Sequence, residues 1–228
     1  MRNFWAYVSN GEFSVGCTGR TVFIYDKDNN EIGRFKDITY GYTPMISPDG
    51  KIVVVKSGEG RFAVYSLETF SLIKKFRYSK CDYSQDDGFC FSPDSNYLIN
   101  VERQIDELHS AISVYDTTDF SLVGRTCFDK NIMLHDIECD VASDSYYVLG
   151  YERFEHENKD FVTQVVDLQL KNITYISRED YELYHHYKNL EIMGFTKKAY
   201  EWSFLDCSFE EIKAKNCSLA ELYKRYNS

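Results

Sequence analysis

The sequence predicts an all-β protein built from repeated four-stranded antiparallel units, followed by a short C-terminal helix. Three observations support this prediction: a Ser-Pro-Asp turn that occurs twice, a matching pair of Phe-Ser-Leu segments, and a composition that favours strands. Hydrophobic residues make up 43% of the 228 positions and aromatic residues 16%. Aromatic and β-branched residues fit pleated strands, and a chain of this length can bury a core of its own.

The repeat is read from its turns. Ser-Pro-Asp begins at Ser47 and again at Ser92, each time between a short apolar segment and a second strand-like segment. Pro presets φ in such a turn and Asp or Gly closes it, so each tripeptide predicts a hairpin. An alternating third strand follows, and the Phe-Ser-Leu segments after Thr69 and Asp119 lead into a fourth. Units of four strands that recur about every 40–50 residues are typical of propeller blades.

Weaker copies precede and follow these two units, so we expect residues 1–228 to form a single small β-propeller domain of about five blades. The approximate blade limits are 3–37, 38–77, 85–128, 135–177 and 190–213, of which the last is short and poorly matched. Ser218 at an N-cap and Glu221 at the capping-box position predict a helix over 218–226. This helix is expected to cover a blade edge or, as the alternative, to dock a partner.

The units resemble divergent WD40-like repeats over roughly residues 3–212. They depart from that family's pattern in two ways. No Gly-His pair opens the units, and Tyr25-Asp26 and Tyr115-Asp116 stand where a Trp-Asp pair would close the third strand. The resemblance therefore implies a propeller, but the family's buried His-Asp network does not carry over to this sequence.

Charge and the cysteines limit the function classes. The formal net charge is −10, which repels nucleic acid and anionic membrane surfaces and attracts a basic protein. No apolar run reaches the length of a signal peptide or a membrane span. The seven cysteines include no Cys-x-x-Cys pair and are predicted to be reduced thiols. We therefore expect a cytoplasmic protein that binds neither nucleic acid nor membranes.

The predicted functional surface is one face of the propeller. The loops between second and third strands, together with the inter-blade connections, are long, acidic and aromatic, and they contain every histidine of the chain. Acidic groups around aromatic anchors are typical of a protein-binding surface. The candidate partner-binding residues are Tyr83, Asp86, Asp87, Glu102, Asp106, Glu107, His109, Phe154, Glu155, Glu157, Tyr181, Tyr184 and His185.

Motifs for chemistry are absent from the sequence. It has no nucleophile elbow, phosphate-binding loop, dinucleotide fingerprint or zinc-protease motif, so no catalytic residue, metal or cofactor is predicted. Asp26-x-Asp28-x-Asn30 begins like a calcium loop, but Glu31 stands where the turn glycine is required, which favours a polar hairpin. His185-His186 is interpreted as structural rather than metal-binding.

The leading hypothesis is a non-catalytic protein whose acidic, aromatic face captures a basic protein. A concrete form is an inhibitor or immunity protein that neutralises a cationic toxin such as a nuclease. The first alternative is a scaffold subunit of a multiprotein complex, which would use the short fifth blade or the C-terminal helix. The second is a propeller hydrolase or lyase with a pocket built from His135, Asp136 and His185.

Overall fold

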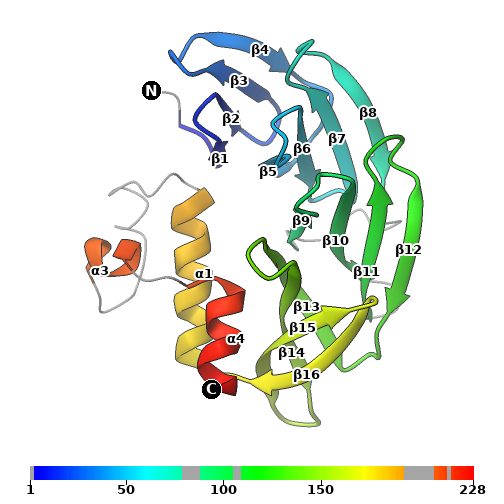
Figure 1. The fold of residues 1–228 in the computed structure, drawn as a ribbon, viewed down its shortest axis with the longest axis vertical. Coiled ribbons are helices and arrows are strands. Elements are labelled where there is room, and N and C mark those ends of the chain that lie inside the picture. The colour runs from blue at the N-terminus through cyan, green and yellow to red at the C-terminus, as the bar shows by residue number, and fades with distance from the viewer. Residues whose placement is uncertain (1–2, 79–87, 105–108, 193–207, 215–216) are drawn as a thin grey trace.

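The computed structural model describes residues 3–78, 88–104, 109–192, 208–214 and 217–228. Within these residues the strands form four antiparallel sheets of four strands each, hydrogen-bonded in chain order. The sheets are arranged along an arc, with the first strand of each on its inner side and the fourth on its outer side (Figure 1). The predicted all-β class is confirmed, and each sheet is a propeller-type blade.

The strands follow the sequence repeat. Blade one consists of β1 (Ala6–Ser9), β2 (Phe13–Cys17), β3 (Val22–Asp26) and β4 (Glu31–Phe35). Blade two consists of β5 (Gly41–Ile46), β6 (Ile52–Ser57), β7 (Arg61–Ser66) and β8 (Leu72–Arg77). Blade three consists of β9 (Phe89–Phe91), β10 (Tyr97–Gln104), β11 (His109–Asp116) and β12 (Leu122–Cys127). Blade four consists of β13 (Ile132–Asp140), β14 (Ser145–Arg153), β15 (Asn158–Val166) and β16 (Gln169–Tyr175).

The two Ser-Pro-Asp segments form the same turn. The Ser47 hydroxyl donates to the Asp49 carboxylate at 2.6 Å, and the Ser92 hydroxyl donates to Asp94 at the same distance. Each serine also accepts a backbone N–H from the strand that follows the turn. The predicted hairpins are therefore present in blades two and three.

Neighbouring blades pack face to face, which explains why the central strands are apolar on both sides. Val53 and Val55 of β6 pack toward blade one, whereas Val54 packs toward blade three, and all three are fully buried. A third cluster lies between blades three and four and includes Val101, Leu134 and Phe161. Full burial of such side chains stabilises the fold by about 1.5–3 kcal/mol each.

Helices cover blade four. α1 (Arg178–Ile192) follows β16, α3 (Phe209–Ala214) comes later, and α4 (Leu219–Asn227) completes the chain. Leu219 and Leu222 of α4 pack with Tyr184 of α1 against Tyr147 and Val162 of blade four. α1 also contacts β1, so it extends from blade four toward blade one across the open side of the arc (Figure 1). No helix in the described part of the chain is long and apolar enough to cross a membrane.

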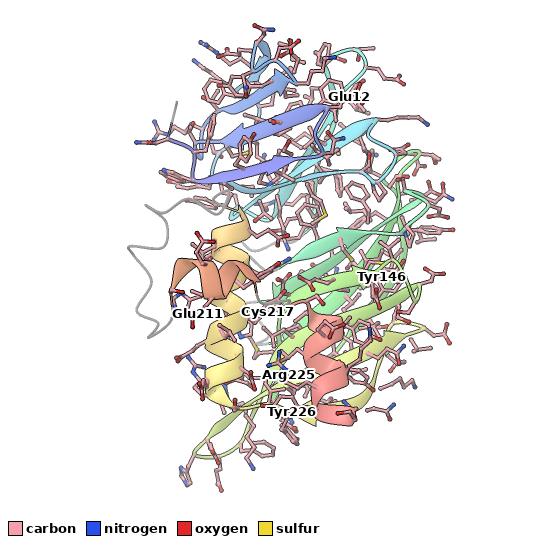
Figure 2. All side chains as sticks on the ribbon, turned by 60° about the vertical axis from the view of Figure 1, so that its left-hand side comes forward. Glu12, Tyr146, Glu211, Cys217, Arg225 and Tyr226 are labelled. Atoms are coloured by element: carbon pink, nitrogen blue, oxygen red, sulfur yellow. The ribbon has the colours of Figure 1, made fainter. Side chains whose placement is uncertain are left out.

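The C-terminal helix was predicted correctly in place and cap. The Ser218 hydroxyl accepts the backbone N–H of Glu221, as an N-cap does. Arg225 and Tyr226 lie near the end of α4 (Figure 2). Both form hydrogen bonds with Asp180 at the start of α1. α4 therefore covers the face of blade four that is turned away from blade three, rather than a blade edge.

Two predictions about the C-terminal third of the chain do not match the structure or are not confirmed by it. The segment 178–189, expected to be a loop between blades, is part of α1. The Ser177 hydroxyl accepts the N–H of Asp180, and acidic residues in the first turn suit the helix dipole, so the segment starts as a helix does. A fifth blade over 190–213 is not confirmed: residues 193–207 lie outside the described part, and its described ends belong to helices.

Leu222→Ala should destabilise the protein by about 2–4 kcal/mol, because Leu222 is only 4% exposed and its truncation leaves a cavity between α4 and blade four. Urea denaturation checks this value. Lys224→Ala on the exposed side of the same helix serves as the control and should shift stability by less than about 0.5 kcal/mol. Equal effects for the two variants would mean that α4 does not pack as described.

Candidate functional site

The predicted functional surface corresponds to one face of the arc, which we call the loop face. It contains the turns between the second and third strands of each blade and the connections between blades. The opposite side, which contains the Ser-Pro-Asp turns, is called the turn face. Tyr83, Asp86, Asp87, Asp106 and Glu107 lie outside the described residues, and His109 is described only as the first residue of β11.

The predicted placement of Glu102 in an exposed loop is wrong. Glu102 lies inside β10 and its side chain is completely buried. The Ser113 hydroxyl donates to it, and Arg125 forms an ion pair with it at 3.2 Å. Burial raises the pKa of Glu102 although Ser113 and Arg125 act in the opposite direction. The strand continues beyond the predicted boundary, so Glu102 joins strands of blade three instead of meeting a partner.

The predicted placement of Tyr181 and Tyr184 is also wrong. They were expected to be exposed anchors, but both are buried residues of α1. Helical spacing turns them toward blade four. The Tyr184 hydroxyl lies 2.6 Å from the Asp136 carboxylate and 3.1 Å from that of Glu138. These tyrosines therefore hold α1 to the sheet.

An ion pair completes this contact. Lys188, one turn after Tyr184, lies 2.5 Å from Glu138, and the other oxygen of Glu138 accepts the Leu219 N–H of α4 at 2.7 Å. Desolvation lowers the pKa of Lys188, but the Glu138 and Asp136 carboxylates outweigh it and hold the pKa above its ordinary value. Desolvation raises the pKa of Asp136. We call Asp136, Glu138, Tyr184 and Lys188 the helix anchor.

The residues of the enzyme alternative lie near one another. The rings of His135 and His185 have centroids 6.0 Å apart, and Tyr181 packs against both. Desolvation, together with Arg178 and His186, lowers the pKa of His185 below its usual value. Asp136, however, bonds Tyr184 and the Ile137 N–H. Within the described residues no group of three or more His, Cys, Asp or Glu could hold a metal ion.

The Asp26 segment is a polar hairpin. The Asp26 carboxylate accepts the side-chain amide of Asn30 at 2.9 Å and the backbone N–H groups of Asn30 and Asp28 at 2.8 and 2.9 Å, and these bonds lower its pKa. Its oxygens therefore close the β3–β4 turn, as the sequence predicted.

Three predicted residues occupy the expected surface. Phe154, Glu155 and Glu157 are exposed in the turn between β14 and β15. Phe154 is 41% exposed and lies beside Tyr175, which is 44% exposed, with ring centroids 6.4 Å apart. The Lys159 ammonium stands over both rings. We call Phe154, Glu155, Glu157, Lys159 and Tyr175 the hairpin patch.

A second aromatic group on the loop face was missed in the sequence. The rings of Trp5 and Tyr42 stack with centroids 5.3 Å apart and planes 9° apart, and Tyr40 lies beside Tyr42. Trp5 is 55% exposed and Tyr40 is 51% exposed. The Trp5 ring covers Gly19, where an added Cβ would come within 2.6 Å of it. We call Trp5, Tyr40 and Tyr42 the aromatic platform.

Tyr40 of the platform combines a strained backbone with an exposed side chain. Tyr40 has a φ of 51°, a conformation that costs an L-residue about 1–2 kcal/mol. Phe120 has a similar φ of 55°, but its ring is only 5% exposed and gains from burial. Tyr40 gains no such burial. Its loop is held by the Ser57 hydroxyl on the Thr39 carbonyl and by the Gly58 N–H on the Tyr40 carbonyl. Strain of this type is typical of functional positions.

The geometry defines a propeller-like all-β protein whose last blade is covered by helices. No family model and no curated protein matches the chain. Among solved structures it is similar to a hydrazine synthase of Kuenenia stuttgartiensis, with a TM-score of 0.61 and 16% identity over 74% of this chain and 52% of that one. It is also similar to the WD40 domain of Toxoplasma gondii coronin, with a TM-score of 0.58 and 14% identity over 76% and 45%.

This chain thus spans about half the length of these two solved chains. Sequence identities this low show the fold alone. The predicted resemblance to WD40-like propellers is confirmed at that level.

Lys188→Met should destabilise the protein by about 3 kcal/mol at neutral pH, because it leaves Glu138 and Asp136 without their counter-ion. The raised pKa of Lys188 means that its stabilising charge is present below its unfolded pKa and is lost as the pH rises through the folded value. The pKa of Asp136 is also raised, so its contribution to the free energy of unfolding is largest at acid pH and is lost as the pH rises through the folded value.

The loss in Lys188→Met should therefore shrink as the pH falls toward about 4, where the carboxyl groups begin to protonate. Urea denaturation across this range measures it. Lys224→Met removes a charge that is 57% exposed and 3.9 Å from Asp140, and should have little effect. A pH-independent loss in Lys188→Met would contradict the electrostatic role of the helix anchor.

Proposed function

We propose that this protein is a non-catalytic binding module that captures a basic protein on its loop face. The observation that supports this most directly is the exposure of aromatic rings there, on a chain with a net charge of −10. Aromatic residues supply contact area at low entropic cost, and carboxylates steer a basic partner toward them. A concrete form of the proposal is an inhibitor or immunity protein that occupies the active surface of a cationic toxin such as a nuclease.

Two features of the loop face support a role in binding. The hairpin patch combines Phe154 and Tyr175 with the exposed acids Glu155 and Glu157. The aromatic platform adds Trp5 and Tyr40, on loops fixed by hydrogen bonds. Exposed rings on fixed loops lose little freedom when a partner binds, which favours affinity.

The scaffold alternative receives less support. It named the short fifth blade or the C-terminal helix as the docking element. The fifth blade is not confirmed, and Leu219, Ala220 and Leu222 of α4 are buried against blade four and α1. The apolar face of α4 is therefore used inside the fold. The enzyme alternative has its named residues near one another, but Asp136 is engaged with Tyr184 of the helix anchor.

Affinity capture from a cell lysate tests the proposal. The tagged protein should retain a stoichiometric basic protein at low salt and release it as the ionic strength rises, because screening weakens the steering charges. Glu155→Gln with Glu157→Gln should reduce the captured amount several-fold. Asp28→Asn with Glu68→Gln removes the same charge from exposed turn-face positions and should leave capture unchanged. A partner that is acidic, or that is retained equally by both double variants, would contradict the proposal.

Tyr40→Gly should separate stability from binding. Glycine relieves the strain of a positive φ but adds freedom to the unfolded chain, so the free energy of unfolding should change by less than about 1 kcal/mol. Capture of the partner should fall, because the exposed ring is lost. Phe120→Gly at the matching φ removes a buried ring and should cost about 3–5 kcal/mol. Retention of full capture by Tyr40→Gly would remove the aromatic platform from the binding surface.

A further inference from the structure

The hairpin patch contains a cation placed over two exposed rings. The Lys159 Nζ lies 5.2 Å from the centroid of Phe154 and 5.9 Å from that of Tyr175. The two ring planes are inclined at 55°, so both can contribute to the environment of one positive charge. Phe154, Tyr175 and Lys159 all remain exposed to solvent. We call the two rings the ring pair.

A fixed carboxylate lies next to the ring pair. Glu152 accepts the Tyr175 hydroxyl at 2.5 Å through one oxygen and the Asn131 amide at 2.8 Å through the other. These two bonds set the direction of the carboxylate and of the Tyr175 ring together. The hydrogen bond to Glu152 also raises the pKa of Tyr175, which keeps its hydroxyl protonated as a donor. Glu155 and Glu157 add negative charge in the adjoining turn.

Lys159 is weakly held at this position. Among the described residues, the ammonium of Lys159 contacts the two ring faces and forms no ion pair within 4.0 Å. Contact with exposed rings favours the stacked position of a cation over the free position by a factor of only about two to five. Its ammonium can therefore leave the rings at little cost, because it remains at the surface and regains water.

We propose that the ring pair is the receptor for an arginine side chain of the basic partner, and that Lys159 is an internal stand-in which that arginine displaces. This inference rests on the proposed function and names the group that the loop face recognises. A guanidinium is planar, stacks on aromatic faces and is more weakly hydrated than an ammonium, so it competes well for the same position. Its N–H groups can also pair with the Glu152 carboxylate, whereas Lys159, which lies opposite Glu152 in the β14–β15 ladder, forms no ion pair with it among the described contacts.

Removal of Lys159 should strengthen the binding of arginine to the ring pair. Lys159→Ala should tighten the binding of N-acetyl-arginine amide about two- to fivefold, because the competing internal cation is gone. An NMR titration at low salt measures this, followed through the aromatic signals of Phe154 and Tyr175. N-acetyl-citrulline amide, which has the same shape without the charge, should bind no better to the variant than to the unchanged protein.

Two control variants separate the ring pair from general charge. Lys27→Ala removes one exposed lysine from the turn face and changes the net charge by the same amount; it should leave arginine binding unchanged. Phe154→Leu in the Lys159→Ala background keeps an apolar side chain but removes a ring face, and should abolish the gain. Circular dichroism of each variant confirms that it is folded before the titration.

The outcomes distinguish this inference from the proposed function. An equal gain for Lys159→Ala and Lys27→Ala, no gain for either, or a gain that survives Phe154→Leu would overturn the ring pair as an arginine receptor, even if a basic protein is captured. A gain specific to Lys159→Ala and lost with Phe154→Leu would support the receptor. The proposed function would still fail by itself if the lysate contained no basic partner for the loop face.

Discussion

Blade four has no further sheet beside it among the described residues, and the rest of the C-terminal architecture depends on how its outer face is covered. In a propeller each sheet buries both faces against its neighbours. Here α1 and α4 supply the missing apolar surface through Tyr181, Tyr184, Leu219 and Leu222. The helices thus replace a sheet in burial, and no backbone hydrogen bonds are lost by this, because the backbone groups of blade four are already paired within the sheet.

Burial alone would allow α1 to slide or rotate on this face, because the hydrophobic effect has little directional preference. The helix anchor removes that freedom. Tyr184 and Lys188 are one turn apart on α1 and meet two carboxylates that are two residues apart on β13. The pairing is costly to desolvate, so it contributes more to the position of α1 than to net stability. Glu138 also accepts the Leu219 N–H, which ties the start of α4 to the same point.

Local sequence signals were sufficient for the parts of the fold that repeat. The Ser-Pro-Asp turns and the capped C-terminal helix are each set by a few adjacent residues, and both were predicted in place. The segment from Ser177 was misassigned because its neighbours in the chain suggested another blade, although Ser177 and Asp180 form a usable helix-start signal. Glu102 was misassigned because strand length depends on pairing with a partner strand, here β11, which is decided in three dimensions.

The candidate site could be predicted only in part for a related reason. Phe154, Glu155 and Glu157 lie next to one another in the chain, so their shared surface follows from the turn that contains them. Trp5, Tyr40 and Tyr42 come from two blades and meet only when blade one packs on blade two. Composition counts aromatic residues but does not separate rings that fill a core, such as Phe120, from rings that remain exposed, such as Tyr40.

The two aromatic groups of the loop face differ in how they are maintained. The aromatic platform depends on backbone strain at Tyr40 and on the space above Gly19, so it is fixed by the fold itself. The hairpin patch depends on side chains, with Glu152 orienting Tyr175 and with Lys159 covering the rings. A surface of the first kind is rigid before any partner arrives. One of the second kind can exchange its own cation for another at small cost, so its selectivity depends on how well the incoming group stacks and pairs.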